Sequence, residues 1–134
     1  MKKIISILAL VCIMTLCLVS CGKSLESYEK NLGDNYRITY LDDYEIDELA
    51  DDFDVNADDY GIKGIMKAKS TSTGSYYAYI IECGSSNKAA NLVDDLAYYV
   101  NLMDYYYSFD VDAVTDSNFV LVGATSVINR ALGK

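Results

Sequence analysis

The order of strand and helix patterns after residue 35 limits the possible folds more than any other feature of this sequence. Apolar residues alternate with polar ones in some stretches and recur every three or four residues in others. The predicted strands cover residues 36–41, 62–69, 76–83 and 109–114, and the predicted helices cover residues 42–53 and 87–107. Residues 76–83 are apolar on nearly both faces, which predicts a central strand.

This strand–helix–strand–strand–helix–strand order (βαββαβ) is that of a split-βαβ, ferredoxin-like α+β domain. It predicts an antiparallel sheet with helices on one face. A helix capped by Ser24 is expected before the first strand, and a strand over 119–122 with a helix from Thr125 or Ser126 forms a C-terminal extension. We therefore expect a single domain over residues 24–134.

The N-terminal leader has a different pattern. Lys2 and Lys3 precede an apolar run over residues 4–19, which only Ser6 and Thr15 soften. A membrane-spanning helix needs about 20 such residues, so this run is short for a permanent span. A basic start, an apolar middle and small residues after it are typical of an export signal.

Leu18-Val19-Ser20-Cys21 closes the leader and is followed by Gly22. This segment resembles the lipobox of bacterial lipoproteins, and the likeness extends no further than Gly22. It implies that residues 1–20 are a signal peptide, that Cys21 carries a diacylglycerol, and that residues 21–23 are a short tether. It also implies an anchor at the extracytoplasmic face of the cell membrane, below a small α/β domain of uncharacterised type. An uncleaved anchor with a chance cysteine is the alternative.

The charge of the chain excludes one class of partner. The formal net charge is −9, and it becomes −11 once Lys2 and Lys3 leave with the leader. Such a protein repels the phosphate backbone of nucleic acids. It also repels anionic lipid headgroups, so we expect acyl chains on Cys21 to make the contact with the membrane.

The cysteines do not predict a disulfide framework. Cys12 and Cys17 lie in the leader and Cys21 is the expected lipid site, which leaves Cys83 alone in the domain. Cys83 follows the central strand, where a buried small hydrophobic residue is expected. A reactive thiol is the alternative, although the absence of histidine from the sequence excludes a Cys–His pair.

The most acidic stretch is residues 42–59, which contain ten Asp and Glu residues and no Lys or Arg. Oxygen-bearing side chains repeat there at every second position, at Asp52, Asp54, Asn56 and Asp58. That spacing is similar to positions 1, 3, 5 and 7 of a calcium loop. Ala57 replaces the glycine of such a loop and Lys63 replaces its last glutamate, so an EF-hand is not expected. The remaining interpretations are a weak Ca²⁺ site and a solvated acidic helix face with its loop. The pattern favours the solvated helix face.

Tyrosine is frequent in this chain, with 13 residues against three Phe and no Trp. Tyrosine offers a large contact area at low entropic cost, so exposed tyrosines can anchor a partner. The candidate partner-binding residues are Tyr98, Tyr99, Tyr105, Tyr106 and Tyr107. The alternative is that these tyrosines replace phenylalanine at the margin of the core.

Lys63, Lys67 and Lys69 form a basic stripe on one predicted strand. This stripe is interpreted as an anion site, as a charged edge that prevents pairing between sheets, or as a local partner of the acidic helix.

No catalytic signature is present. The sequence contains neither a histidine nor a glycine-rich phosphate loop. We therefore expect a binding or interaction module of unknown ligand, without a cofactor, rather than an enzyme. The alternative is a Ca²⁺- or carbohydrate-binding accessory protein of the cell envelope.

Overall fold

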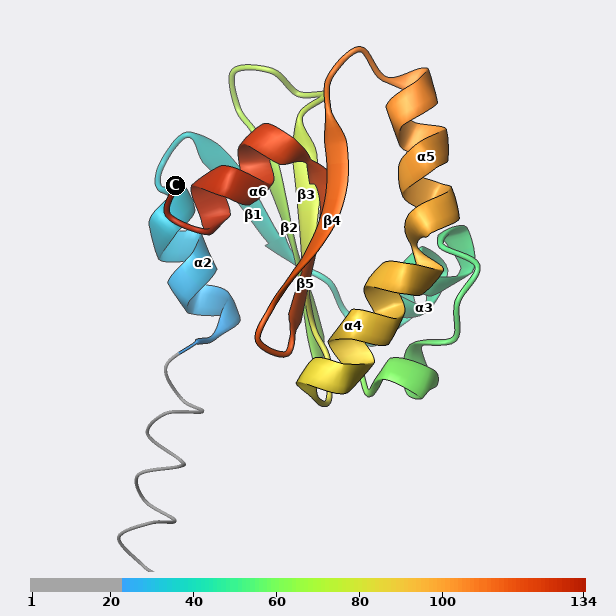
Figure 1. Cartoon of the computed structure of the whole chain (residues 1–134). Coiled ribbons are helices and arrows are strands. Elements are labelled where there is room, and N and C mark those ends of the chain that lie inside the picture. Colours follow the sequence, from blue (N-terminus) through green and yellow to red (C-terminus); the bar gives the residue numbers. More distant parts are fainter. Residues whose placement is uncertain (1–22) are drawn as a thin grey trace, which may run out of the picture.

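The computed structural model describes residues 23–134, so the predictions for the leader and for Cys21 lie outside the described residues. A five-stranded sheet stands between two layers of helices (Figure 1). The strands are β1 (Tyr36–Tyr40), β2 (Gly64–Ser70), β3 (Tyr77–Glu82), β4 (Val111–Asp116) and β5 (Phe119–Ala124). The helices are α2 (Leu25–Leu32), α3 (Asp43–Asp52), α4 (Ser86–Asp95), α5 (Ala97–Tyr106) and α6 (Thr125–Ala131), with a 3-10 turn, η1 (Ala57–Tyr60). None of these helices is long and apolar enough to cross a membrane.

The predicted α+β class and the antiparallel sheet are confirmed. The strand order is β1-β2-β3-β5-β4, and β3 lies at the centre, as predicted from its two apolar faces. Chain order alone does not decide which strands pair. β1 pairs only with β2 and stands at an edge, whereas the first strand of a split-βαβ sheet lies inside the sheet. β5, from the C-terminal extension, is inserted between β3 and β4.

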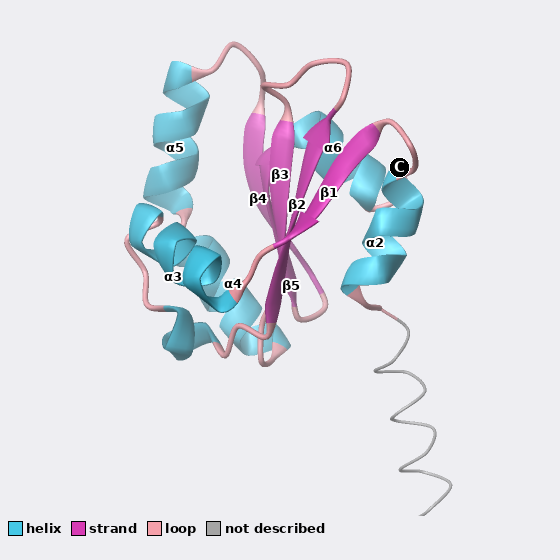
Figure 2. Cartoon of the chain, turned by 180° about the vertical axis from the view of Figure 1, so that it is seen from behind, coloured by secondary structure: helices cyan, strands magenta, loops and turns pink. Residues whose placement is uncertain are grey.

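Helices cover both faces of this sheet (Figure 2). The helices inside the predicted βαββαβ order, α3 to α5, lie on one face, as expected. α2 and α6 flank that order in the sequence and pack together against the other face. Two of the three interior strands, β3 and β5, are therefore covered on both sides.

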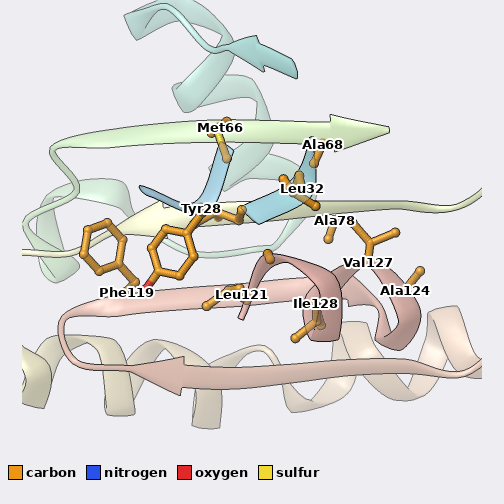
Figure 3. Close-up of a cluster of buried hydrophobic side chains, with 12 residues drawn as sticks. Tyr28, Leu32, Met66, Ala68, Ala78, Phe119, Leu121, Ala124, Val127 and Ile128 are labelled. Carbon is orange, nitrogen blue, oxygen red and sulfur yellow. The ribbon is translucent and has the colours of Figure 1, made fainter. Parts of the chain in front are cut away.

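The core under α2 and α6 contains the side chains of Figure 3. Leu32 and Ile128 come from the two helices, and Met66 and Leu121 come from β2 and β5. The edge of the Tyr28 ring meets Phe119, with the ring centroids 5.1 Å apart. Each large apolar side chain buried here stabilises the fold by about 1.5–3 kcal/mol relative to exposure.

The core on the opposite face is built from α3, α4 and the alternate residues of the same strands. Leu49 and Phe53 of the α3 region and Leu92 of α4 pack with Ile81 and Val120. Ile80 and Ile81 are neighbours in sequence but belong to different cores, because successive side chains of a strand point to opposite faces.

The single helix predicted over residues 87–107 is wrong. The segment forms two helices, α4 and α5, which meet at Leu96. Leu96 is fully buried, and its φ and ψ of −83° and −3° depart from regular helical values. Burial of Leu92 and Leu96 fixes α4 on the sheet, and the change of direction lets α5 follow β4. The apolar period continues across the break, so the period alone could not reveal it.

Gly123 allows β5 to approach β3 closely. Its φ is +140°, which L side chains rarely adopt, and it lies opposite Ala78 in the register. A Cβ atom added there would lie 2.4 Å from the carbonyl oxygen of Tyr77 and 2.6 Å from the Cα atom of Ala78. Both are backbone atoms, so the two strands would have to separate.

We therefore predict that Gly123→Ala lowers the free energy of unfolding by about 3 kcal/mol, from overpacking and backbone strain together. Urea unfolding of a soluble chain of residues 23–134, followed by circular dichroism, measures the change. Gly74→Ala is the matched control, because the nearest atom to its added Cβ is Lys69 Cε at 3.6 Å. Equal stability of the two variants would contradict the close approach of the strands.

Candidate functional site

The most unusual surface of the described domain is the part of one sheet face that no helix covers. Figure 2 shows α3 and α5 on this side of the sheet. On the same side, β1 and β2 carry polar residues where the neighbouring strands are apolar. Arg37 lies opposite Lys69 in the register, and Thr39 lies opposite Lys67. Residues opposite each other in paired strands share a face, so these four side chains project to the same side.

The side chain of Lys67 lies over two tyrosine rings on this face. Its Nζ atom lies 4.9 Å from the ring centroid of Tyr77 and 5.6 Å from that of Tyr79, both on β3. The negative faces of aromatic rings attract an ammonium group. β2 pairs with strands on both sides, so the interpretation of its lysines as guards of a sheet edge is wrong.

A cleft of about 340 Å³ separates Lys67 from helix α3. Its lining residues are Thr39, Leu41, Glu45, Glu48, Leu49, Asp52, Lys67 and Tyr79. The three acidic residues follow one another at intervals of three and four, so they share one face of α3. The cleft thus has an acidic helix on one side and a lysine with tyrosine rings on the other.

The N-terminal cap of α3 places these carboxylates. Asp42 accepts a hydrogen bond from the backbone N–H of Glu45 at 2.8 Å, and Glu45 Oε2 accepts one from the backbone N–H of Asp42 at 2.9 Å. This reciprocal pair is a capping box, and its pattern, an Asp followed three residues later by Glu, is visible in the sequence. The hydrogen bond commits Glu45 to the helix end, whereas Glu48 and Asp52 line the cleft without capping the helix.

A second depression of about 220 Å³ adjoins the basic end of the same face. Arg37, Lys69, Ser70, Thr71 and Gly74 line it, next to the turn between β2 and β3. Like charges directly opposite each other destabilise a sheet, and Arg37 and Lys69 are such a pair. An anionic group placed between them would offset that repulsion.

The five tyrosines predicted to bind a partner differ in their exposure to solvent. Tyr98, Tyr105 and Tyr106 are 72–83% exposed on α5. Tyr99 packs against Phe53 with ring centroids 4.6 Å apart, and Tyr107 packs against Phe109 at 4.9 Å. Partner binding by the three exposed tyrosines stays a prediction. Tyr99 and Tyr107 also pack at the margin of the core.

The half-buried tyrosines Tyr77, Tyr79 and Tyr99 form a neutral aromatic surface beside the cleft. Burial raises the pKa of Tyr79 to about 12, and the negative charge of Asp52 contributes to the shift. Burial also raises the pKa of Tyr77, together with the neighbouring phenols of Tyr99 and Tyr107. These phenols stay protonated at neutral pH and offer O–H groups and ring faces, not charge.

The four candidate Ca²⁺ ligands do not form one group. Asp52 lines the cleft, and Asp54 occupies a left-handed backbone position with φ of +59°. Asn56 caps η1, where its side chain accepts the backbone N–H of Asp58 at 3.0 Å. Across residues 23–134, no three carboxylate, thiol or imidazole groups lie close enough together to hold a metal ion.

Cys83 is buried at the end of β3, as predicted for a small hydrophobic residue. Burial, with the nearby charge of Glu82, raises the pKa of its thiol to about 11. The thiolate is the reactive form, so this environment makes Cys83 a poor nucleophile.

The N-terminal end of the described chain is fixed to the sheet. Lys23 forms an ion pair with Asp116, which also accepts a hydrogen bond from the Tyr28 hydroxyl at 2.8 Å. Burial alone raises the pKa of Asp116, but the hydrogen bonds from Lys23 and Tyr28 outweigh it and hold the pKa below its usual value. The chain therefore enters the domain at the β4–β5 turn.

Sequence reasoning offered the lysine stripe as a local partner of the acidic helix but missed the cleft that lies between Lys67 and that helix. It also missed Arg37, Thr39 and Tyr79 as neighbours of Lys67. The available signal was the polar residue at alternate positions in the first strand, matching the lysines of the second. Without the register of the two strands, that signal could not be interpreted.

Comparison with protein-family models, curated proteins and solved structures found no match to this chain.

We predict that Ca²⁺ and Na⁺ at equal ionic strength give equal shifts in melting temperature, because Asn56 is engaged by η1 and the candidate ligands are dispersed. Both cations would then act only by screening the negative charge. Differential scanning calorimetry measures the shifts. A shift with Ca²⁺ alone that Asp54→Asn abolishes would establish a calcium site instead.

Cys83 should resist alkylation by iodoacetamide at pH 8 until the chain unfolds. With a pKa of about 11, only about one thiol in a thousand is ionised at that pH, and burial blocks access as well. Mass spectrometry of a chain of residues 23–134, with and without urea, tests this. Complete labelling of the folded chain would show a reactive thiol.

Proposed function

We propose that this protein is a small lipoprotein that holds a ligand-binding domain at the extracytoplasmic face of the cell membrane. The basic start, the apolar run and Leu18-Val19-Ser20-Cys21 support the anchor. Two acyl chains on Cys21 would hold the domain on a bilayer, which one chain does only marginally.

The observation that carries the binding role is the cleft between α3 and the sheet. It brings Lys67, the carboxylates of Glu48 and Asp52, and the ring of Tyr79 around one space. Ligand sites combine apolar walls with a few convergent polar groups, and this cleft has both. The sequence contains no histidine, so we propose binding rather than catalysis.

The path of the chain supports this arrangement. Lys23 follows Cys21 by two residues, which span at most about 7 Å, and it is paired with Asp116 at one end of the sheet. α2 then packs on the sheet face opposite to the cleft. An anchor on Cys21 would therefore keep the domain close to the membrane without covering the cleft.

Carbohydrate binding is the second candidate function. Tyr79 presents part of its ring to the cleft, and Glu48 and Asp52 supply hydrogen-bond acceptors for hydroxyl groups. The choice between ligand classes depends on the charges in the cleft.

Cys21→Ser should leave an uncleaved precursor without lipid, because the thiol that accepts the diacylglycerol is absent. The unchanged protein should begin at Cys21 and carry acyl mass. Mass spectrometry of the N-terminal peptide from membranes of a bacterial host tests both expectations.

Cys17→Ser is the matched control, since this cysteine lies within the leader and should not affect maturation. A mature N-terminus elsewhere than Cys21, or the absence of acyl mass, would refute the proposed anchor.

A further inference from the structure

The cleft holds charges of both signs on opposite walls. Lys67 rests over the rings of β3, on the sheet side, while Glu48 and Asp52 project from α3. Among residues 23–134 the only ion pair is Lys23–Asp116, so the charges do not neutralise each other across the cleft. The cation–π contacts hold the ammonium of Lys67 near the sheet and keep the two signs apart.

This separation of charge restricts the ligand. A ligand with only negative groups would meet Glu48 and Asp52, and a ligand with only positive groups would meet Lys67. A neutral ligand would displace water from all three charged groups without supplying a counter-charge, which costs free energy. A ligand that carries both an ammonium and a carboxylate satisfies both walls.

This proposal rests on the proposed binding function. We propose that the cleft binds a small zwitterion, namely an amino acid or a dipeptide with free ends. Its ammonium lies between Glu48 and Asp52, and its carboxylate lies at Lys67 Nζ. The Thr39 hydroxyl donates a second hydrogen bond to that carboxylate.

The apolar part of the lining accounts for the rest of such a ligand. Leu41, Leu49 and the ring of Tyr79 face the same cleft and would contact an aliphatic side chain. A volume of about 340 Å³ lies at the lower end of the range for small-molecule sites, about 300–1,000 Å³. The space therefore suits one or two residues and not a long polymer.

The test is isothermal titration calorimetry of the full-length chain, purified in mild detergent, with the dipeptide leucyl-leucine. Its N-acetyl form lacks the ammonium, and its amide form lacks the carboxylate. We expect leucyl-leucine to bind and each capped form to bind at least tenfold more weakly. Glucose is titrated in parallel as the carbohydrate probe.

Variants test which wall of the cleft binds each charged group of the ligand. Lys67→Met should weaken leucyl-leucine at least tenfold and make binding indifferent to the amide cap. Glu48→Gln combined with Asp52→Asn should make binding indifferent to the acetyl cap. Lys63→Met and Asp51→Asn are the matched controls, since both side chains are exposed and do not line the cleft, and they should bind like the unchanged chain.

A melting curve of each variant separates lost binding from lost folding. Glu48 and Asp52 are exposed, so the Glu48→Gln and Asp52→Asn substitutions still test the proposal even if Lys67→Met destabilises the sheet. Equal affinity for capped and free peptides, or no binding of any peptide to the folded chain, would overturn the zwitterion proposal. Binding of glucose that Glu48→Gln abolishes would also overturn it, yet would leave the proposed binding module in place. The acyl-mass measurement on Cys21 decides the anchor independently of all these outcomes.

Discussion

Burial of β3 and β5 on both faces is the constraint on which the rest of this structure depends. All six residues of β5 are buried, and Ile80 and Ile81 of β3 enter opposite cores. Helices on one face alone would close only one of the two cores. The N-terminal α2 and the C-terminal α6 are therefore part of the fold, although they flank the βαββαβ order. Gly123 completes the arrangement by letting β5 approach β3 without a side chain between them.

The same constraint explains where binding is feasible. Most side chains of β3 and β5 are committed to the cores, and of these two strands only Tyr79 lines the cleft. β1 and the adjoining part of β2 lie toward the free edge, where α3 and α5 leave one face open. Polar side chains are tolerated there because water reaches them, as it reaches Arg37 and Thr39. The boundary between the open and the covered part of that face is the cleft beside α3.

Charge gives this boundary its chemical character. The sequence has a net charge of −9, so an isolated group of cations is the exception on its surface. Arg37, Lys67 and Lys69 gather on one sheet face, and α3 brings its acidic residues beside them. Opposed charges that packing holds apart are preorganised, so a ligand with both signs of charge would need little rearrangement of the protein. Tyr79 and its neighbours complete the wall as uncharged phenols, because burial raises their pKa values.

The sequence by itself determined the α+β class, the capping box of α3, the central position of β3 and the burial of Cys83. Each of these depends on local period, on local hydrogen bonds or on a run of apolar residues. Only the tertiary structure decided that β5 lies between β3 and β4, that α4 and α5 separate at Leu96, and that Lys67 faces Glu48 and Asp52. Those features depend on contacts between residues far apart in the chain. The spacing of residues along one segment carries no information about which other segment will pack against it.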